Sequence, residues 1–128
     1  MHHLYRYLRS LGAPMRDARH DWLPRLEERH LAAGRHLQRP GDDVAAYYVL
    51  GSGTLRIYGY RGGKDVTTWI STEPQLFADL GALRQNAPTR FGFELLTDAT
   101  VYVLDRVHVL ALERTSLSWN QLTGRVWE

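Results

Sequence analysis

Apolar residues recur at three- and four-residue spacing in the first part of the chain, as at Leu4, Leu8 and Leu11. This is the period of an amphipathic helix. A second helical segment carries Pro24, which either kinks it or stands in its first turn. The pattern therefore predicts an N-terminal helical flap over residues 1–30.

From residue 32 onward apolar and polar residues alternate, which is the period of a strand with one buried face. Turns rich in glycine, proline and aspartate separate the alternating segments. A loop is expected over residues 71–75, which contain Pro74. Strands are predicted at residues 35–39, 47–50, 54–60, 65–70, 91–96 and 100–105.

A tight loop around Gly62 and Gly63 joins strands 54–60 and 65–70 in a predicted hairpin. Simple alternation divides the second strand into two faces, because successive side chains point to opposite sides. It puts Val66, Thr68 and Ile70 on one face and Thr67 and Trp69 on the other.

Two helices are predicted beside the strands, one at residues 77–85 and one that begins after Asp105, a favoured N-cap residue. Residues 116–128 are interpreted as the start of a C-terminal dimerisation helix. Strands at spacings of about 8–12 residues are typical of sandwiches, barrels and jelly rolls. The expected fold is therefore mainly β with flanking helices, with the β-roll over residues 31–115.

Composition limits the classes of function. The 128 residues, 44% of them hydrophobic, fit one globular domain. The absence of cysteine excludes disulfides and thiolate chemistry and fits the cytoplasm. No apolar run reaches the roughly 20 residues that span a bilayer, so no membrane partner is expected. The net charge of +2 does not indicate a nucleic-acid reader.

The histidines show no metal-binding or catalytic spacing. His30 and His36 are an even number of residues apart and could share a strand face, but no carboxylate joins them convincingly. No serine stands in a nucleophile elbow. We therefore expect no metal site and no catalytic residue, and we predict that the protein is not an enzyme.

An ordered series of turns and strands carries more information than any single segment. It begins at Gly41 and residues 47–58 (YYVLGSGTLRIY), and continues with the sequences FADLGAL at residues 77–83 and PTR at residues 88–90. The series covers about residues 30–115 and resembles the effector domain of the Crp/Fnr family of regulators. The resemblance implies a double-stranded β-helix, or jelly roll, of the cyclic-nucleotide-binding type.

The resemblance also implies a ligand site. In that family a short helix and the strand after it form a phosphate-binding cassette, with the pattern Phe-Gly-Glu-Leu followed by Arg-(Ser/Thr)-Ala. Helix amides and the arginine hold a phosphate, while the glutamate accepts from a ribose hydroxyl. The pattern carries over to Phe77, Ala78, Asp79, Leu80, Gly81, Ala82, Thr89 and Arg90 as ligand-binding positions.

This sequence departs from the family pattern in three places. Ala78 replaces glycine and Asp79 replaces glutamate, while the order Thr89-Arg90 puts the arginine one place late. On a strand, a shift of one residue sends a side chain to the opposite face. The effector is therefore expected to be a cyclic nucleotide or another small anion, and not classical cyclic AMP.

Simpler roles remain open for the two charged residues of the cassette. Asp79 is equally suited to cap the helix after it, and Arg90 could be a solvated strand residue that pairs with Glu94.

The resemblance implies the sensor domain of a homodimeric bacterial transcription regulator, which would contact DNA only through a domain absent from this chain. The alternative is a degenerate roll that binds no ligand and serves dimerisation or protein interaction. Exposure of Leu110, Leu117 and Trp119 would favour that alternative. A cupin-like enzyme ranks third.

Overall fold

The computed structural model describes residues 6, 9, 22–116 and 119–120 of the chain. A 3-10 turn, η1 (Leu23–Arg25), precedes the strands. The helices described here are α3 (Leu80–Gln85) and α4 (Arg106–Thr115). The strands of this part of the chain are β1 (Glu27–Leu31), β2 (His36–Gln38), β3 (Ala46–Ser52), β4 (Leu55–Arg61), β5 (Lys64–Ser71), β6 (Gln75–Phe77), β7 (Gly92–Leu95) and β8 (Ala99–Asp105).

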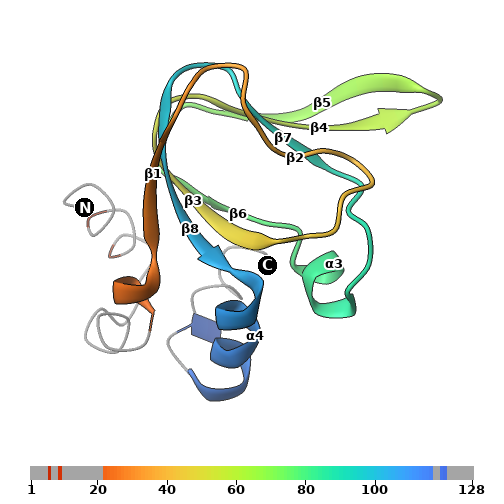
Figure 1. Ribbon diagram of the computed structural model, residues 1–128. Helices are drawn as coiled ribbons and strands as arrows, with labels where there is room; N and C mark the ends of the chain where they lie inside the picture. Colours follow the sequence, from red (N-terminus) through yellow and green to blue (C-terminus); the bar gives the residue numbers. More distant parts are fainter. Residues whose placement is uncertain (1–5, 7–8, 10–21, 117–118, 121–128) are drawn as a thin grey trace.

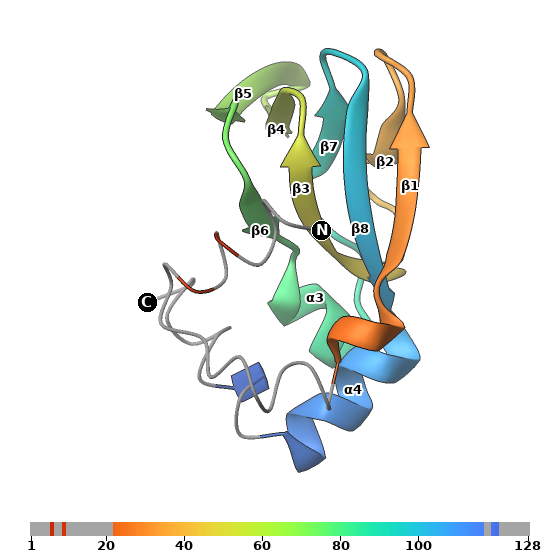
Figure 2. The same ribbon diagram turned by 90° about the vertical axis from the view of Figure 1, so that its left-hand side faces the viewer.

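The strands form two four-stranded sheets, in the orders β1-β8-β3-β6 and β2-β7-β4-β5, and their pairings are antiparallel. Figure 1 shows the two sheets as the walls of a roll, with the β4–β5 hairpin projecting at one side. Helices α3 and α4 lie together at one end of the roll, as both views show (Figure 2). The expected mainly β jelly roll is confirmed.

One hydrophobic cluster fills the space between the sheets. Three buried aromatic rings meet there: Tyr48 stacks on Phe77 at a centroid distance of 5.3 Å, and Phe93 meets the edge of Phe77 at 5.0 Å. A second cluster lies on the opposite face of the first sheet, where Tyr47 and Trp119 pack with ring centroids 4.9 Å apart. Alternation along β3 accounts for both clusters, because neighbouring residues face opposite sides.

The helical expectation for residues 22–30 is wrong. Only η1 is helical there, with Pro24 in its first turn, and β1 begins at Glu27 and pairs with β8. The sequence does not predict β1 because this strand lies at the edge of its sheet. Residues 27–30 are exposed there, so the strand needs no alternation of apolar and polar residues. The other expected flap residues, apart from Arg6 and Arg9, lie outside the described residues.

The alternation expected in β5 is also wrong, because a β-bulge interrupts its pairing with β4. Trp69 lies opposite Ile57, and Thr67 lies opposite Tyr58, so that Thr68 is the extra residue. A bulge shifts the side-chain parity by one. Val66 and Trp69 therefore share a face.

Two boundaries near the cassette differ as well. The expected loop over residues 71–75 ends in the start of β6, and α3 begins at Leu80 rather than at residue 77. No helix in the described part of the chain is long and apolar enough to cross a membrane.

A substitution at Gly92 tests how closely β4 and β7 pack at the Tyr58–Gly92 pair. A Cβ at this position would overlap the ring of Tyr58, which is buried against the glycine. We expect Gly92→Ala to lower the free energy of unfolding by about 1–3 kcal/mol, as overpacked cores do. Urea denaturation would measure this change in the free energy of unfolding.

Gly81→Ala is the matched control. At Gly81 an added Cβ would meet only the Asp79 Oδ1 atom, at 3.7 Å, and alanine favours the helix. Equal destabilisation by both substitutions would contradict the packing argument.

Candidate functional site

The cassette segment runs from β6 through Asp79 and α3 to the loop before β7. Asp79 is the N-cap of α3, and its Oδ1 atom accepts from the Ala82 amide at 3.1 Å. Leu80 and Leu83 turn into the hydrophobic core and fix the helix on the roll. Asn86 ends the helix in a left-handed conformation with φ of 55°. The N-cap interpretation of Asp79 is confirmed.

The hydroxyl of Thr89 is the centre of the cassette. It donates to Asp79 Oδ2 at 2.8 Å, and it accepts from Gln38 Nε2 at 3.2 Å and from the Phe91 amide at 3.1 Å. One donor and two acceptor positions are all that a hydroxyl offers. Thr89, which is only 2% exposed, therefore joins α3, β2 and the loop before β7 through one saturated oxygen atom.

Arg90 is separated from this arrangement. Its side chain is exposed, and among the described residues it has no hydrogen-bond or ion-pair partner. The expected pair with Glu94 is wrong, because Glu94 contacts Arg56 and His36 instead. The chain bends at Arg90, between the buried Thr89 and the start of β7, and the Arg90 side chain lies in solvent.

The remaining expected site residues divide between the core and the surface. Phe77, Ala78, Leu80 and Ala82 are buried in the two hydrophobic clusters, whereas Gly81 is exposed. The structure thus brings Asp79, Ala82 and Thr89 into contact and leaves Arg90 apart. The assignment of these residues to a ligand stays a prediction.

Gln38 belongs to the cassette but gives no signal in the sequence. It stands on β2, far from Thr89 along the chain, and donates to the Phe91 carbonyl at 3.0 Å as well as to Thr89. Its Oε1 atom is buried with no hydrogen-bond partner in the described structure. A glutamine in a short strand has many uses, so only the three-dimensional fold identifies this one.

The roll interior beside the cassette is occupied by protein side chains. Burial among Phe77 and Phe93 raises the pKa of Tyr48, whose hydroxyl lies 3.5 Å from the Leu37 carbonyl. At the edge of the roll, Trp69 is 56% exposed and its indole N–H donates to Gln75 Oε1 at 3.0 Å. Trp69 is therefore the large aromatic residue that stands open beside β6, the strand that leads into the cassette.

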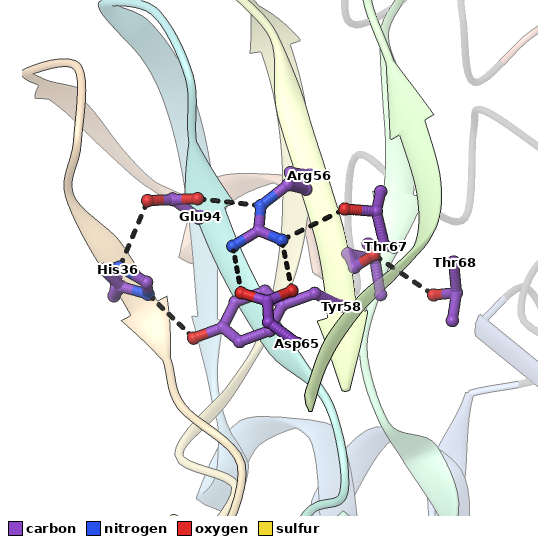
Figure 3. A network of polar contacts seen from close by, with 8 residues as sticks. His36, Arg56, Tyr58, Asp65, Thr67, Thr68 and Glu94 are labelled. Atoms are coloured by element: carbon purple, nitrogen blue, oxygen red, sulfur yellow. Dashed lines mark hydrogen bonds and ion pairs between the residues drawn. The ribbon is translucent and has the colours of Figure 1, made fainter. Parts of the chain in front are cut away.

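A polar network ties together the four strands of the second sheet on its outer face (Figure 3). Arg56 on β4 donates to both oxygens of Asp65, at 2.7 and 3.0 Å, and to Glu94 Oε1 at 2.8 Å. His36 on β2 lies 3.3 Å from Glu94 and 3.1 Å from the Tyr58 hydroxyl. Hydrogen bonding from Arg56 lowers the pKa of Asp65. The network anchors the β4–β5 hairpin.

Two arginine contacts join the cassette helix to α4. Arg106 donates to the Leu83 carbonyl at 3.1 Å, and Arg84 pairs with Glu113 at 2.9 Å. Asp105 caps α4 as expected, with its Oδ1 atom accepting from the His108 amide. A displacement of α3 would therefore act directly on α4.

A separate depression of about 410 Å³ lies at the opposite end of β8 from α4, and His30, Ser52, Asp98 and Thr100 are among its lining residues. His30 stands on β1 and His36 on β2, in different sheets, so the expectation of a shared face is wrong. In the described residues, no three histidine, aspartate or glutamate side chains are grouped as metal ligands.

The chain belongs to the cyclic nucleotide-binding domain family, whose profile matches residues 28–116. No curated protein matches the chain in sequence. The resemblance to Crp-family effector domains is confirmed by the family match together with the structural matches that follow.

The catabolite activator protein of Thermus thermophilus matches with a TM-score of 0.74 and 22% identity, over 88% of this chain and 53% of its own. The regulatory domain of Toxoplasma gondii PKA, crystallised with cyclic AMP, matches with a TM-score of 0.74 and 24% sequence identity. The match covers 86% of this chain and 43% of that one.

The regulator CLP of Xanthomonas campestris, described as responsive to cyclic di-GMP, gives a TM-score of 0.70 and 15% identity, over 85% of this chain and 54% of its own. The chain spans about half the length of the first regulators it matches. Identities this low show the shared fold.

The hydroxyl of Thr89 can be tested by removing it. Thr89→Val keeps the shape but leaves Gln38 and the Phe91 amide without their acceptor, and we expect a loss of about 1–3 kcal/mol in the free energy of unfolding. Thr89→Ser keeps the hydroxyl and should lose less than about 1 kcal/mol. Urea denaturation of both variants decides, and equal losses would contradict the central role of the hydroxyl.

Burial of Tyr48 predicts a loss of stability in alkali. Its folded-state pKa is raised above the ordinary value of 10.0, so its contribution is complete below that pH. The contribution is lost as the pH rises through the folded-state pKa, because the unfolded chain releases the proton first. Tyr48→Phe should flatten the decline in urea midpoint above about pH 10. An unchanged decline in the Tyr48→Phe variant would contradict this.

Proposed function

We propose that this domain is the ligand-sensing part of a Crp-like transcription regulator and takes a small anionic effector at the cassette formed by Asp79, α3 and residues 89–90. The observation that carries the proposal is the local arrangement of β6, a capped short helix and a returning segment, joined by Thr89, in a chain of the cyclic nucleotide-binding domain family. The exposed Gly81 gives access to its surface.

Classical cyclic AMP is not the proposed effector. The carboxylate of Asp79 is already engaged by Ala82 and Thr89, so its two oxygens are held inside the cassette. The exposed Arg90 supplies no cation facing that carboxylate. A phosphate at this place would lack the bidentate arginine contact that favours such anions.

The proposal also gives a route for the signal. Effector binding would shift the population of α3 positions, and the contacts of Arg106 and Arg84 would transmit the shift to α4. We further propose a homodimer, with DNA bound through a separate domain, and a cytoplasmic location in keeping with the cysteine-free composition. No catalytic step is assigned to the domain.

A degenerate roll that binds no ligand is the second candidate. The aromatic filling between the sheets favours it, because Tyr48, Phe77 and Phe93 occupy the interior. One expected mark of this alternative is missing, since Trp119 is buried, and Leu110 is only partly exposed. Leu117 lies outside the described residues.

A thermal-shift screen tests the sensing function. We expect cyclic AMP to give no shift and at least one member of a panel of small carboxylates, phosphates and other cyclic nucleotides to give one. A ligand at 100 times its dissociation constant adds about 2.7 kcal/mol, which is a shift of several degrees for a domain of this size.

Gly81→Glu should abolish that shift, because it places a second carboxylate at the cassette surface. An acidic residue in the first turn of a helix favours folding. Thr115→Glu carries the same charge at the exposed end of α4 and should keep the shift. If no compound shifts the melting temperature, the sensing proposal fails and the degenerate roll is favoured.

A further inference from the structure

We propose that the depression at the end of β8 away from α4 is a second binding site, separate from the cassette, and that it takes a neutral molecule with several hydroxyl groups, such as a monosaccharide. Three polar side chains stand there in a row across three strands. His30 on β1 and Ser52 on β3 both lie opposite Thr100 on β8. Because residues directly opposite in antiparallel strands share a face, these three side chains are neighbours in the wall of one depression of about 410 Å³.

A β-bulge brings Ser52 into this row. The pairing of β3 with β8 shifts between Leu50 and Ser52, so that Gly51 is the extra residue. Leu50 faces the core between the sheets, and regular alternation would turn Ser52 to that same side. The bulge changes the parity. Ser52 therefore joins Thr100 on the opposite face, the face that Tyr102 and the second hydrophobic cluster occupy.

Two glycines allow this bulge to lie close to β8. A Cβ at Gly51 would come within 2.7 Å of the Tyr102 ring. A Cβ at Gly53 would come within 2.6 Å of the Ala99 Cβ atom and 2.7 Å of the Asp98 carbonyl. Gly53 also has a φ of 102°, which residues with a side chain rarely adopt. The backbone that carries the polar row is thus closely packed, so a ligand would order little of it on binding.

The depression offers hydrogen-bonding atoms that are held in place and still have capacity. Asp98 Oδ1 accepts from the Ala33 amide at 2.9 Å, and His30 Nδ1 lies 3.1 Å from the Thr100 hydroxyl. Among the described residues, Asp98 Oδ2, His30 Nε2 and the Ser52 hydroxyl have no partner. The carboxylate oxygen accepts, the hydroxyl both donates and accepts, and the imidazole nitrogen does one or the other according to its tautomer.

These atoms fit a ligand whose own groups both donate and accept. A ligand hydroxyl can donate to the Asp98 carboxylate and exchange hydrogen bonds with Ser52 and His30. An ammonium group only donates and a carboxylate only accepts, and the described lining has no lysine or arginine to hold an anion. The volume lies in the range of small-molecule sites. Since α3 lies at the other end of the roll with α4 (Figure 2), the inference does not depend on the proposed function.

Amide chemical shifts of the full chain, measured by NMR, test this site. The probes are D-ribose and D-glucose as neutral polyols, ethanolamine as an ammonium compound and acetate as an anion. We expect at least one sugar to give saturable shifts in residues 30–32, 52 and 98–100, with a dissociation constant in the millimolar range. Ethanolamine and acetate should give none there.

Asp98→Asn is the first variant, because it keeps an acceptor for the Ala33 amide and removes the carboxylate. It should weaken sugar binding by about tenfold or more, as the loss of a hydrogen bond to a charged group does. Asp43→Asn makes the same change at an exposed aspartate outside the depression and should leave sugar binding unchanged.

Ser52→Ala gives an independent check if Asp98→Asn fails to fold, as judged by circular dichroism. Ser52 is exposed, so its removal should keep the fold, and the lost hydroxyl should weaken sugar binding severalfold. The inference is overturned if neither sugar gives saturable shifts in these residues, or if ethanolamine or acetate binds there as tightly. It is also overturned if the folded variants bind the sugar as the unmodified chain does.

Discussion

The hydroxyl of Thr89 is the contact on which the cassette depends. It holds the cap of α3, the end of β2 and the approach to β7 to one buried oxygen atom. A buried polar group is costly unless all its partners are present. The Thr89 hydroxyl therefore couples the positions of these three segments.

In the second sheet, charged side chains stabilise a projecting hairpin. Its β4–β5 hairpin projects from the roll and has β5 as an exposed edge (Figure 1). Arg56 stabilises this hairpin by its paired bonds to Asp65 and connects it to β7 through Glu94. The bulge at Thr68 also disturbs the regular edge, which discourages pairing with another chain. The second sheet thus has a polar network on its outer face and aromatic packing on its inner face.

Alternation and turn residues were sufficient to predict most of this fold. The strands β3, β4, β5, β7 and β8 lie in segments where strands were expected, and Asp79 and Asp105 cap the helices as their type predicts. The sequence could not reveal β1, whose exposed edge needs no apolar pattern, nor the bulge in β5, which depends on pairing with β4. Gln38 was missed because its role arises only from contacts distant in sequence.

The family match and the altered site are compatible because different residues carry them. Buried aliphatic and aromatic side chains such as Leu50 and Phe93 determine the fold of the roll. These core positions do not depend on which ligand is bound. Ligand choice depends on a few polar positions, and here the cation is displaced by one residue while a threonine occupies the inward position. The fold can therefore be kept while the polar side chains of the cassette differ, and here the arginine lies in solvent at a bend of the chain.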